Sequence, residues 1–263
     1  MKALKKYLKK LKSNITALLE VQQESFTPDT FHTLRLEIKK LNALLNLVNF
    51  CSKGLKQKKT FKPFKLIFCQ AGKVRELQLE RVLLNQYFAS AYIMQYRNDL
   101  EKKLREELNN YFLIPNESFA EKLQKKYSKI NAALAKTNRK MTNRYMDKKR
   151  AEIEKILHKK ALKNKQMHAL RKSLKEYQFN QKSLNFNKQD KLSPKNYALP
   201  ELLGEWHDFQ TVIQHLKKAV DSGEINQKES NQLENVIATF TFKSQLLFSK
   251  INATVRNVPL NPT

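Results

Sequence analysis

The residues best suited to chemistry are histidine, arginine and lysine side chains that recur with the same spacing in two segments. The members are His32, Arg35 and Lys39 in the first segment and His168, Arg171 and Lys175 in the second. Positions i, i+3 and i+7 share one face of an α-helix, because seven steps of about 100° almost complete two turns. Each segment therefore predicts a row of cations and imidazoles along one helix. Such a row suits a polymer that carries a negative charge on every repeat unit.

A second element follows each segment and combines a glycine, a cation and an acid at matched spacing. The members are Gly72, Arg75 and Glu76 in the first copy and Gly204, His207 and Asp208 in the second. Glycine inside a helix costs ~1 kcal/mol relative to alanine, so its presence in both copies predicts a close approach by another helix. An acid there can orient a neighbouring arginine or histidine through a charge-assisted hydrogen bond. Because the two elements recur in the same order, the chain is predicted to be an internal duplication.

The chain is strongly basic, and this limits its possible partners. Its 263 residues include 51 Lys and Arg against 24 Asp and Glu, which gives a formal net charge of +27. A folded protein with so much like charge usually has a polyanionic partner. Nucleic acid, an anionic membrane and inorganic polyphosphate are the candidates. No membrane partner is expected, because the apolar face of the amphipathic stretch 1–20 is predicted to pack on the next helix.

The breaker residues and the apolar spacing predict an all-α protein. Only four Gly and seven Pro are present, and leucine and isoleucine recur at helical spacing, as at Leu4, Leu8, Leu11 and Ile15. Pro28 is placed to begin a second helix, and Pro115 marks the clearest break, near the middle of the chain. Segment 179–193 is predicted to be a loop or a frayed helix end, and residues 259–263 a disordered tail.

Catalytic and metal sites are not expected. The sequence has no glycine-rich phosphate loop and no nucleophile elbow, and its five histidines lack the spacing of metal ligands. Cys51 and Cys69 are predicted to be reduced thiols. No secretory signal and no run of ~18 apolar residues is present. We therefore expect a soluble cytoplasmic protein that is not an enzyme and needs no cofactor or metal.

The paired elements resemble those of the CHAD domain, the conserved histidine α-helical domain. That family repeats His-x-x-Arg-x-x-x-Lys/Arg on one helix and Gly-x-x-Arg/His-Asp on a later one, and the resemblance covers essentially the whole chain. It implies one domain, 1–263, in which two pseudo-symmetric antiparallel helical bundles, 1–115 and 116–258, surround a central basic groove or pore. It also implies non-catalytic binding of inorganic polyphosphate, with possible association with polyphosphate granules. The implied binding residues are His32, Arg35, Lys39, Lys40, Arg75, His168, Arg171, Lys172, Lys175 and His207.

Three positions depart from the family pattern. Asn42 and Gln178 stand where the family often has a further arginine, and Glu76 replaces the usual aspartate. The first two changes are expected to shorten the basic row in both halves or to tune its affinity.

Nucleic-acid binding is the alternative function. The basic run from Lys136 to Lys165 can contact a phosphate backbone without reading sequence. However, Tyr145 is the only aromatic side chain in that run, whereas proteins that bind single strands interleave several stacking aromatics. Nucleic acid is therefore expected to be at most a weaker polyanionic partner.

Overall fold

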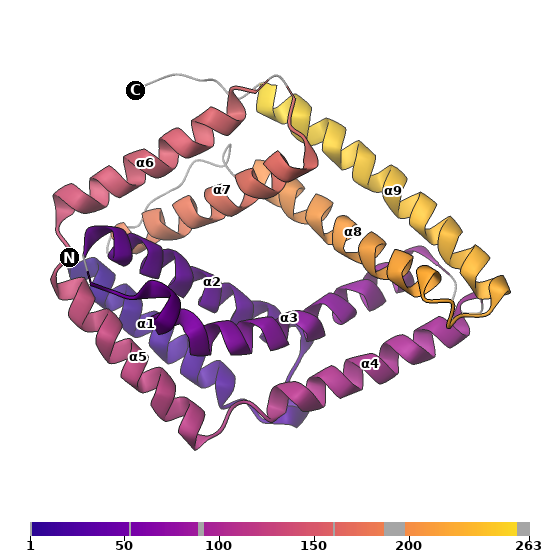
Figure 1. The fold of residues 1–263 in the computed structure, drawn as a ribbon, viewed down its shortest axis with the longest axis horizontal. Helices are drawn as coiled ribbons and strands as arrows, with labels where there is room; N and C mark the ends of the chain where they lie inside the picture. Colours follow the sequence, from indigo (N-terminus) through magenta and orange to yellow (C-terminus); the bar gives the residue numbers. More distant parts are fainter. Residues whose placement is uncertain (1, 53, 89–91, 160, 187–197, 257–263) are drawn as a thin grey trace. The chain divides into compact units, whose positions relative to one another are not determined.

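The structure, a computed structural model, describes residues 2–52, 54–88, 92–159, 161–186 and 198–256. Within these ranges all regular secondary structure is helical, which confirms the all-α prediction (Figure 1). The helices are α1 (Lys2–Leu19), the 3-10 helix η1 (Gln23–Ser25), α2 (Pro28–Cys51), α3 (Gln57–Tyr87), α4 (Met94–Phe112), α5 (Glu117–Ala135), α6 (Arg139–Leu157), α7 (Asn164–Leu184), α8 (Ala198–Asp221) and α9 (Gln227–Arg256). In this part of the chain, no helix is long and apolar enough to cross a lipid bilayer. The predicted tail, 259–263, lies outside the described residues.

The chain divides into two compact units, and each is discontinuous in sequence. Unit 1 consists of Met1–Arg75, Glu106–Ile153 and Ser173–Lys191, and unit 2 of Glu76–Arg105, Glu154–Lys172 and Leu192–Thr263. Helices α3, α4, α6 and α7 therefore each contribute residues to both units. The predicted internal duplication and the predicted halves, 1–115 and 116–258, stay predictions.

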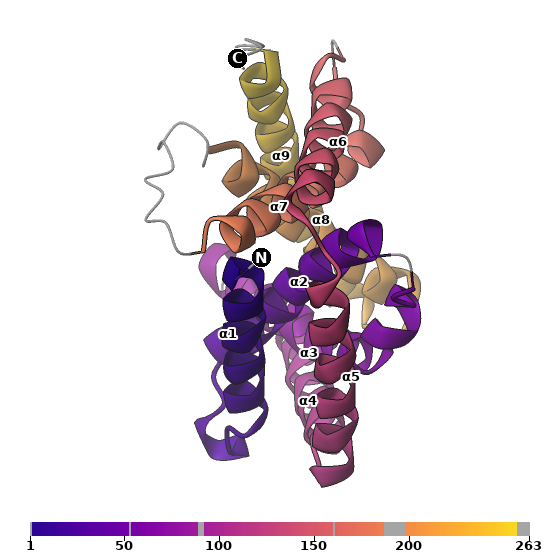
Figure 2. The ribbon, with the colours of Figure 1, turned by 90° about the vertical axis from the view of Figure 1, so that its left-hand side faces the viewer.

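In unit 1 the helices α1, α2 and α5 pack against one another (Figures 1 and 2). The apolar stripe predicted for the first helix is confirmed, because Leu4, Leu8, Leu11 and Ile15 are all buried. The next helix begins at Pro28, as its sequence predicts. Its first turn is closed by a reciprocal capping box between Thr27 and Thr30, which satisfies amide groups that have no partner within the helix.

An aromatic cluster in unit 1 fixes the entry of the chain into α2. Phe26 contacts Phe31, Tyr111 and Phe112, with ring centroids 4.5, 5.3 and 5.2 Å away. Phe31 and Tyr111 are fully buried. Because His32 directly follows Phe31, this packing sets the direction in which the candidate row of cations begins.

In unit 2 the helices α8 and α9 run antiparallel and side by side as a helical hairpin (Figure 1). Gly223 in the short connection has φ +69°, a left-handed conformation that favours glycine. Phe209 and Phe240 pack between the two helices with their ring centroids 5.5 Å apart. The only tryptophan, Trp206, is 1% exposed, so it belongs to the core.

The prediction of a loop or a frayed helix end over 179–193 is wrong for residues 179–184. Helix α7 continues to Leu184, and the side chains of Asn180 and Ser183 are fully buried. Ser183 Oγ donates a hydrogen bond to the Asn180 carbonyl, 2.7 Å away. The helix thus continues through buried polar residues, which its weak apolar spacing does not reveal. Residues 187–197 lie outside the described part of the chain.

Candidate functional site

Arg35 on α2 is held against α3 within unit 1. Its Nη1 donates a hydrogen bond to the Phe68 carbonyl, 3.0 Å away, and its guanidinium lies 4.4 Å from the centroid of the Phe68 ring. Lys39 Nζ lies 5.8 Å from the same centroid. A cation over an aromatic face is attracted by the ring's negative charge density. The Phe68 ring and backbone therefore position two members of the predicted row.

Gly72 provides the space that Arg35 occupies. A Cβ atom built at Gly72 would lie 1.9 Å from Arg35 Nη1, far inside van der Waals contact. The close approach predicted at this glycine is therefore real, but it is made by a side chain rather than by a neighbouring helix. The same prediction is wrong at Gly204, because, apart from its chain neighbours and the adjacent backbone of its own helix, no described atom lies within 4 Å of a Cβ built there.

His32 is surrounded by cations from three helices of unit 1. Desolvation is the largest cause that lowers the pKa of His32 below its ordinary value, followed by the charges of Arg75, Lys39 and Lys175; Asp29 opposes them. Arg75 lies on α3 and Lys175 on α7. Its spacing in the sequence groups Lys175 with His168 and Arg171. In the structure, however, Lys175 is one of the charges that act on His32.

Lys40 faces an acid of its own helix. Its ammonium forms an ion pair with Glu37, whose side chain is only 5% exposed and also accepts a hydrogen bond of 3.0 Å from Asn14 Nδ2. A buried carboxylate is costly without such partners. The charge of Lys40 is therefore compensated within the protein by Glu37. The sequence pattern instead places Lys40 among the residues implied to bind polyphosphate. The buried Glu37 was not singled out from the sequence, although its i, i+3 spacing to Lys40 permits the pair.

In unit 2, His168 lies against two aromatic rings of α8. Its ring centroid is 4.6 Å from that of Trp206 and 5.2 Å from that of His207, which stands edge-on at 89°. Burial lowers the pKa of His168, and the charges of Lys172 and Arg171 lower it further. The structure thus brings the predicted residues of this unit together around the buried tryptophan.

Arg171 is a half-buried cation with Asp208 beside it. Burial lowers the pKa of Arg171, and the negative charge of Asp208 raises it. A guanidinium nevertheless stays charged in proteins. Its Nε is buried and has no hydrogen-bond partner among the described residues.

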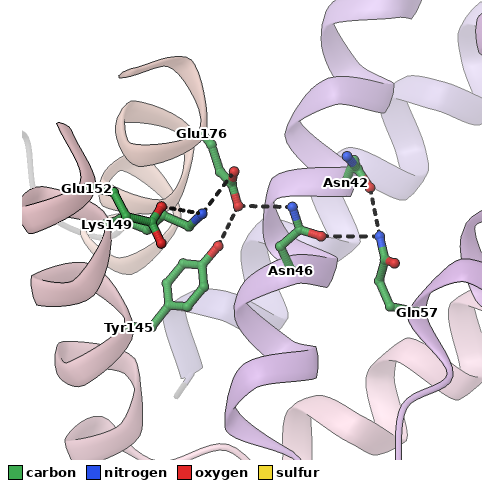
Figure 3. Close-up of polar contacts among 7 residues, drawn as sticks. All are labelled: Asn42, Asn46, Gln57, Tyr145, Lys149, Glu152 and Glu176. Carbon is green, nitrogen blue, oxygen red and sulfur yellow. Dashed lines mark hydrogen bonds and ion pairs between the residues drawn. The ribbon is translucent and has the colours of Figure 1, made fainter. Parts of the chain in front are cut away.

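Asn42, which replaces the expected arginine, lies in a polar network of unit 1 (Figure 3). Gln57 Nε2 donates to the side-chain oxygens of Asn42 and Asn46, 3.1 Å away in each case. Asn46 Nδ2 in turn donates to Glu176 on α7 at 2.9 Å. The amide at position 42 thus joins the start of α3 to α2, a role that needs an acceptor oxygen and that a guanidinium cannot perform.

Glu176 completes that network with α6. It also accepts from the Tyr145 hydroxyl, and Lys149 Nζ lies 3.5 Å from its Oε2 and 3.0 Å from Glu152. Burial, followed by the hydrogen bond to Glu176, raises the pKa of Tyr145. Two residues of the predicted basic run, Tyr145 and Lys149, are therefore part of the structural core of unit 1.

Glu76, the acid of the first glycine element, faces a histidine of unit 2. His215 Nε2 lies 3.7 Å from Glu76, and His215 Nδ1 lies 3.0 Å from the buried Glu80. The hydrogen bond to Glu80 is the largest cause that raises the pKa of His215. The sequence pattern does not reveal this group, because Glu76 and Glu80 lie on α3 whereas His215 lies on α8, far away in the sequence. Among the described residues, no three His, Cys, Asp or Glu side chains are grouped to hold a metal ion.

Comparison with solved structures identifies the fold. The chain superimposes on the crystal structure of the CHAD domain from the plant Ricinus communis with a TM-score of 0.75 and 12% identity, over 97% of this chain and 89% of that one. It superimposes on PptA from Streptomyces chartreusis with a TM-score of 0.70 and 9% identity, over 97% and 99% of the two chains. No family model matches the sequence, and no curated protein is significantly similar to it. The helices that carry the histidines, arginines and lysines described above therefore belong to a CHAD-like fold.

Proposed function

We propose that this protein binds inorganic polyphosphate without catalysing a reaction on it. The observation that carries the proposal is that each unit holds an arginine in a fixed place beside a histidine and further cations. The first cation set is His32, Arg35, Lys39, Arg75 and Lys175, in unit 1. The second cation set is His168, Arg171, Lys172 and His207, in unit 2. The CHAD-like fold and the net charge of +27 support the same proposal.

The two side-chain types have different roles in this proposal. Arginine offers a planar fork of donors that matches two phosphate oxygens, whereas lysine acts as a compact charge. Release of counterions from the polymer contributes much of the affinity, so binding should weaken steeply as salt rises. The basic cavity that the CHAD resemblance implies, and association with polyphosphate granules in the cytoplasm, are part of the proposal.

Binding to nucleic acid is the competing function, and the basic run on α6 is the surface it would use. Within that run Lys149 already pairs with two carboxylates, and Tyr145 is 4% exposed and cannot stack on a base. The run therefore offers fewer accessible groups than its composition suggests, which favours polyphosphate over nucleic acid.

Competition binding tests the proposal. Labelled polyphosphate is displaced at ~0.15 M salt, where charges more than ~8 Å apart are largely screened, by unlabelled polyphosphate, duplex DNA or RNA at equal phosphate concentration. Displacement by polyphosphate alone supports the proposal. Equal displacement by nucleic acid would identify a general polyanion binder.

The pH dependence of binding follows from the lowered pKa values of His32 and His168. A phosphate polymer stabilises the protonated imidazole, so the pKa of each histidine is higher in the complex than in the free protein. Affinity should therefore rise as pH falls through the complex pKa, and level off only below the free-state pKa, which lies under 6.5. A difference of one pKa unit in one histidine corresponds to ~10-fold in affinity.

The measurement is the polyphosphate Kd at several pH values for the wild type and for H32Q/H168Q. The polymer's own titration affects both proteins equally, so the difference between the two profiles isolates the histidines. Identical profiles would exclude the imidazoles as ligands.

Replacing Gly72 by alanine should weaken polyphosphate binding by ~10-fold, roughly the value of one charge-assisted hydrogen bond. The new Cβ must displace the Arg35 guanidinium from its place on Phe68. Gly204→Ala is the matched control, because that site is open and alanine gains ~1 kcal/mol of helix propensity. Affinity is measured by titration and stability by thermal denaturation. Unchanged affinity in Gly72→Ala would show that the position of Arg35 does not matter for binding.

A further inference from the structure

A pocket of about 450 Å³ lies in unit 1 where the α2–α3 connection meets the C-terminal part of α5. Its lining residues are Ser52, Gly54, Leu55, Lys56, Lys59, Thr60, Lys126, Lys129, Ala132, Ala133 and Lys136. None of these residues belongs to either cation set. The volume falls within the range of ~300–1,000 Å³ that is typical of small-molecule sites.

The charge of this pocket is of one sign. Among the described residues that line it, five are lysines and none is aspartate or glutamate; the lysines are Lys56, Lys59, Lys126, Lys129 and Lys136. Ammonium groups that share a concave surface repel one another, and low-dielectric walls strengthen that field. A bound anion removes this repulsion. Lysine binds phosphate as a point charge, without the fixed geometry that arginine imposes.

The backbone adds to the positive field at one side of the pocket. Lys59 and Thr60 belong to the first turn of α3. The Thr60 amide donates to the Lys56 carbonyl, 2.9 Å away, and only the amide groups before it lack an acceptor within the helix. The last turn of α5 presents carbonyl groups of the opposite sign. There the Lys136 amide donates to the carbonyls of Ala133 and Leu134. These hydrogen bonds partly neutralise the negative charge of the two carbonyl oxygens, so the oxygens attract a cation less. The five ammonium groups therefore dominate the pocket.

We propose that this pocket binds a compact anion with several linked phosphate groups, such as inorganic triphosphate or the triphosphate of a nucleotide. The pocket volume of about 450 Å³ exceeds what one phosphate ion fills, and its lysines come from both α3 and α5. Leu55, Ala132 and Ala133 form an apolar wall that a nucleoside can contact and inorganic triphosphate cannot. The inference is independent of the proposed function, because it uses no residue of the cation sets.

Chemical protection of lysines tests the pocket in the intact chain. The protein is acetylated briefly with and without inorganic triphosphate or ATP, and modification at each lysine is quantified by mass spectrometry. Both ligands should protect Lys59 and Lys129 several-fold more than Lys65 and Lys122, which are exposed on the same two helices but do not line the pocket. Stronger protection by ATP would show that the nucleoside contacts the apolar wall. Equal protection by the two ligands would show that the phosphates alone are bound. Protection of neither pocket lysine, or equal protection of all four, would overturn the proposal.

Paired substitutions give an independent measurement. K59A/K129A should weaken triphosphate binding by ~10-fold, since two solvent-exposed charge contacts are lost and each contributes less than a buried one. K65A/K122A changes the net charge equally and should leave the affinity unchanged. All four lysines are exposed, so both variants should fold, and thermal denaturation checks this. Equal loss in both variants would mean that diffuse charge binds the ligand. Failure of polyphosphate binding at the cation sets would not alter either outcome.

Discussion

Replacing Arg35 and Arg171 together with alanine is expected to weaken polyphosphate binding by at least ~100-fold. A hydrogen bond to a charged group contributes ~1.5–3 kcal/mol, and each 1.4 kcal/mol corresponds to a factor of ten in affinity. Arg35 is already held in place by Phe68 and Gly72, so little entropy is lost when a phosphate binds. Arg171 is half-buried, with Asp208 and His168 beside it, so its position is also constrained before a phosphate binds.

A matched control removes the same charge elsewhere. Lys140 and Arg144 are exposed on α6 in unit 1, and K140A/R144A should lower the affinity only through net charge. Lys149 is unsuitable as a control, because its loss would leave Glu152 and Glu176 without their ion pair. The Kd of each variant is measured by titration with polyphosphate of one chain length. Similar losses in the two double variants would show that diffuse charge, rather than fixed arginines, binds the polymer.

A charge-conserving pair separates charge from geometry. R35K/R171K keeps both cations but removes the planar fork of donors. An intermediate affinity is expected, with a salt dependence close to that of the wild type because the number of cations is unchanged. Full wild-type affinity would mean that only charge matters at these positions.

The helices of this fold could be predicted from local sequence signals. Leu4, Leu8, Leu11 and Ile15 repeat at helical spacing, and all four are buried as that spacing predicts. Such signals report which face of a helix is apolar and where a helix starts. Segment 179–184 lacks a strong apolar stripe and its buried residues include Asn180 and Ser183, so local sequence signals do not predict this part of the helix.

The candidate site could be predicted only in part. Spacing correctly identified His32, Arg35 and Lys39 as members of one face of α2, because helical geometry alone determines that relation. The influence of Lys175 on His32 depends on packing between helices that are far apart in sequence. No pattern within one helix contains that information.

Three acidic residues with little exposure help to explain how such a basic chain can fold. Glu37, Glu80 and Glu176 are buried or half-buried, and each accepts hydrogen bonds from neighbouring side chains. Their partners are mostly structural groups, such as the tyrosine hydroxyls at 96 and 145. A buried carboxylate with these partners ties helices together, and its charge is used within the protein. The acids therefore stabilise the fold while much of the positive charge remains available to an external polyanion.

Trp206→Ala is expected to destabilise the protein by ~3–5 kcal/mol, the usual cost of removing a fully buried large aromatic side chain. Trp206 is 1% exposed, and its indole supports the His168 ring at 4.6 Å, so the substitution creates a cavity below the second cation set. Trp206→Phe retains most of the buried volume and should cost much less. Stability is measured by urea denaturation followed by circular dichroism. A loss under ~1 kcal/mol in Trp206→Ala would contradict the buried position of this ring.

The same residue links stability to binding, because it is the chain's only tryptophan and reports on unit 2 by fluorescence. Binding of polyphosphate at His168 and Arg171 should favour the protonated imidazole, and a charge change 4.6 Å from the indole should alter its emission. The change should disappear in R171A, in which the indole remains but the proposed phosphate contact is lost. R35A, in unit 1, should retain it. An emission change that persists in R171A would place the bound phosphate elsewhere than at the second cation set.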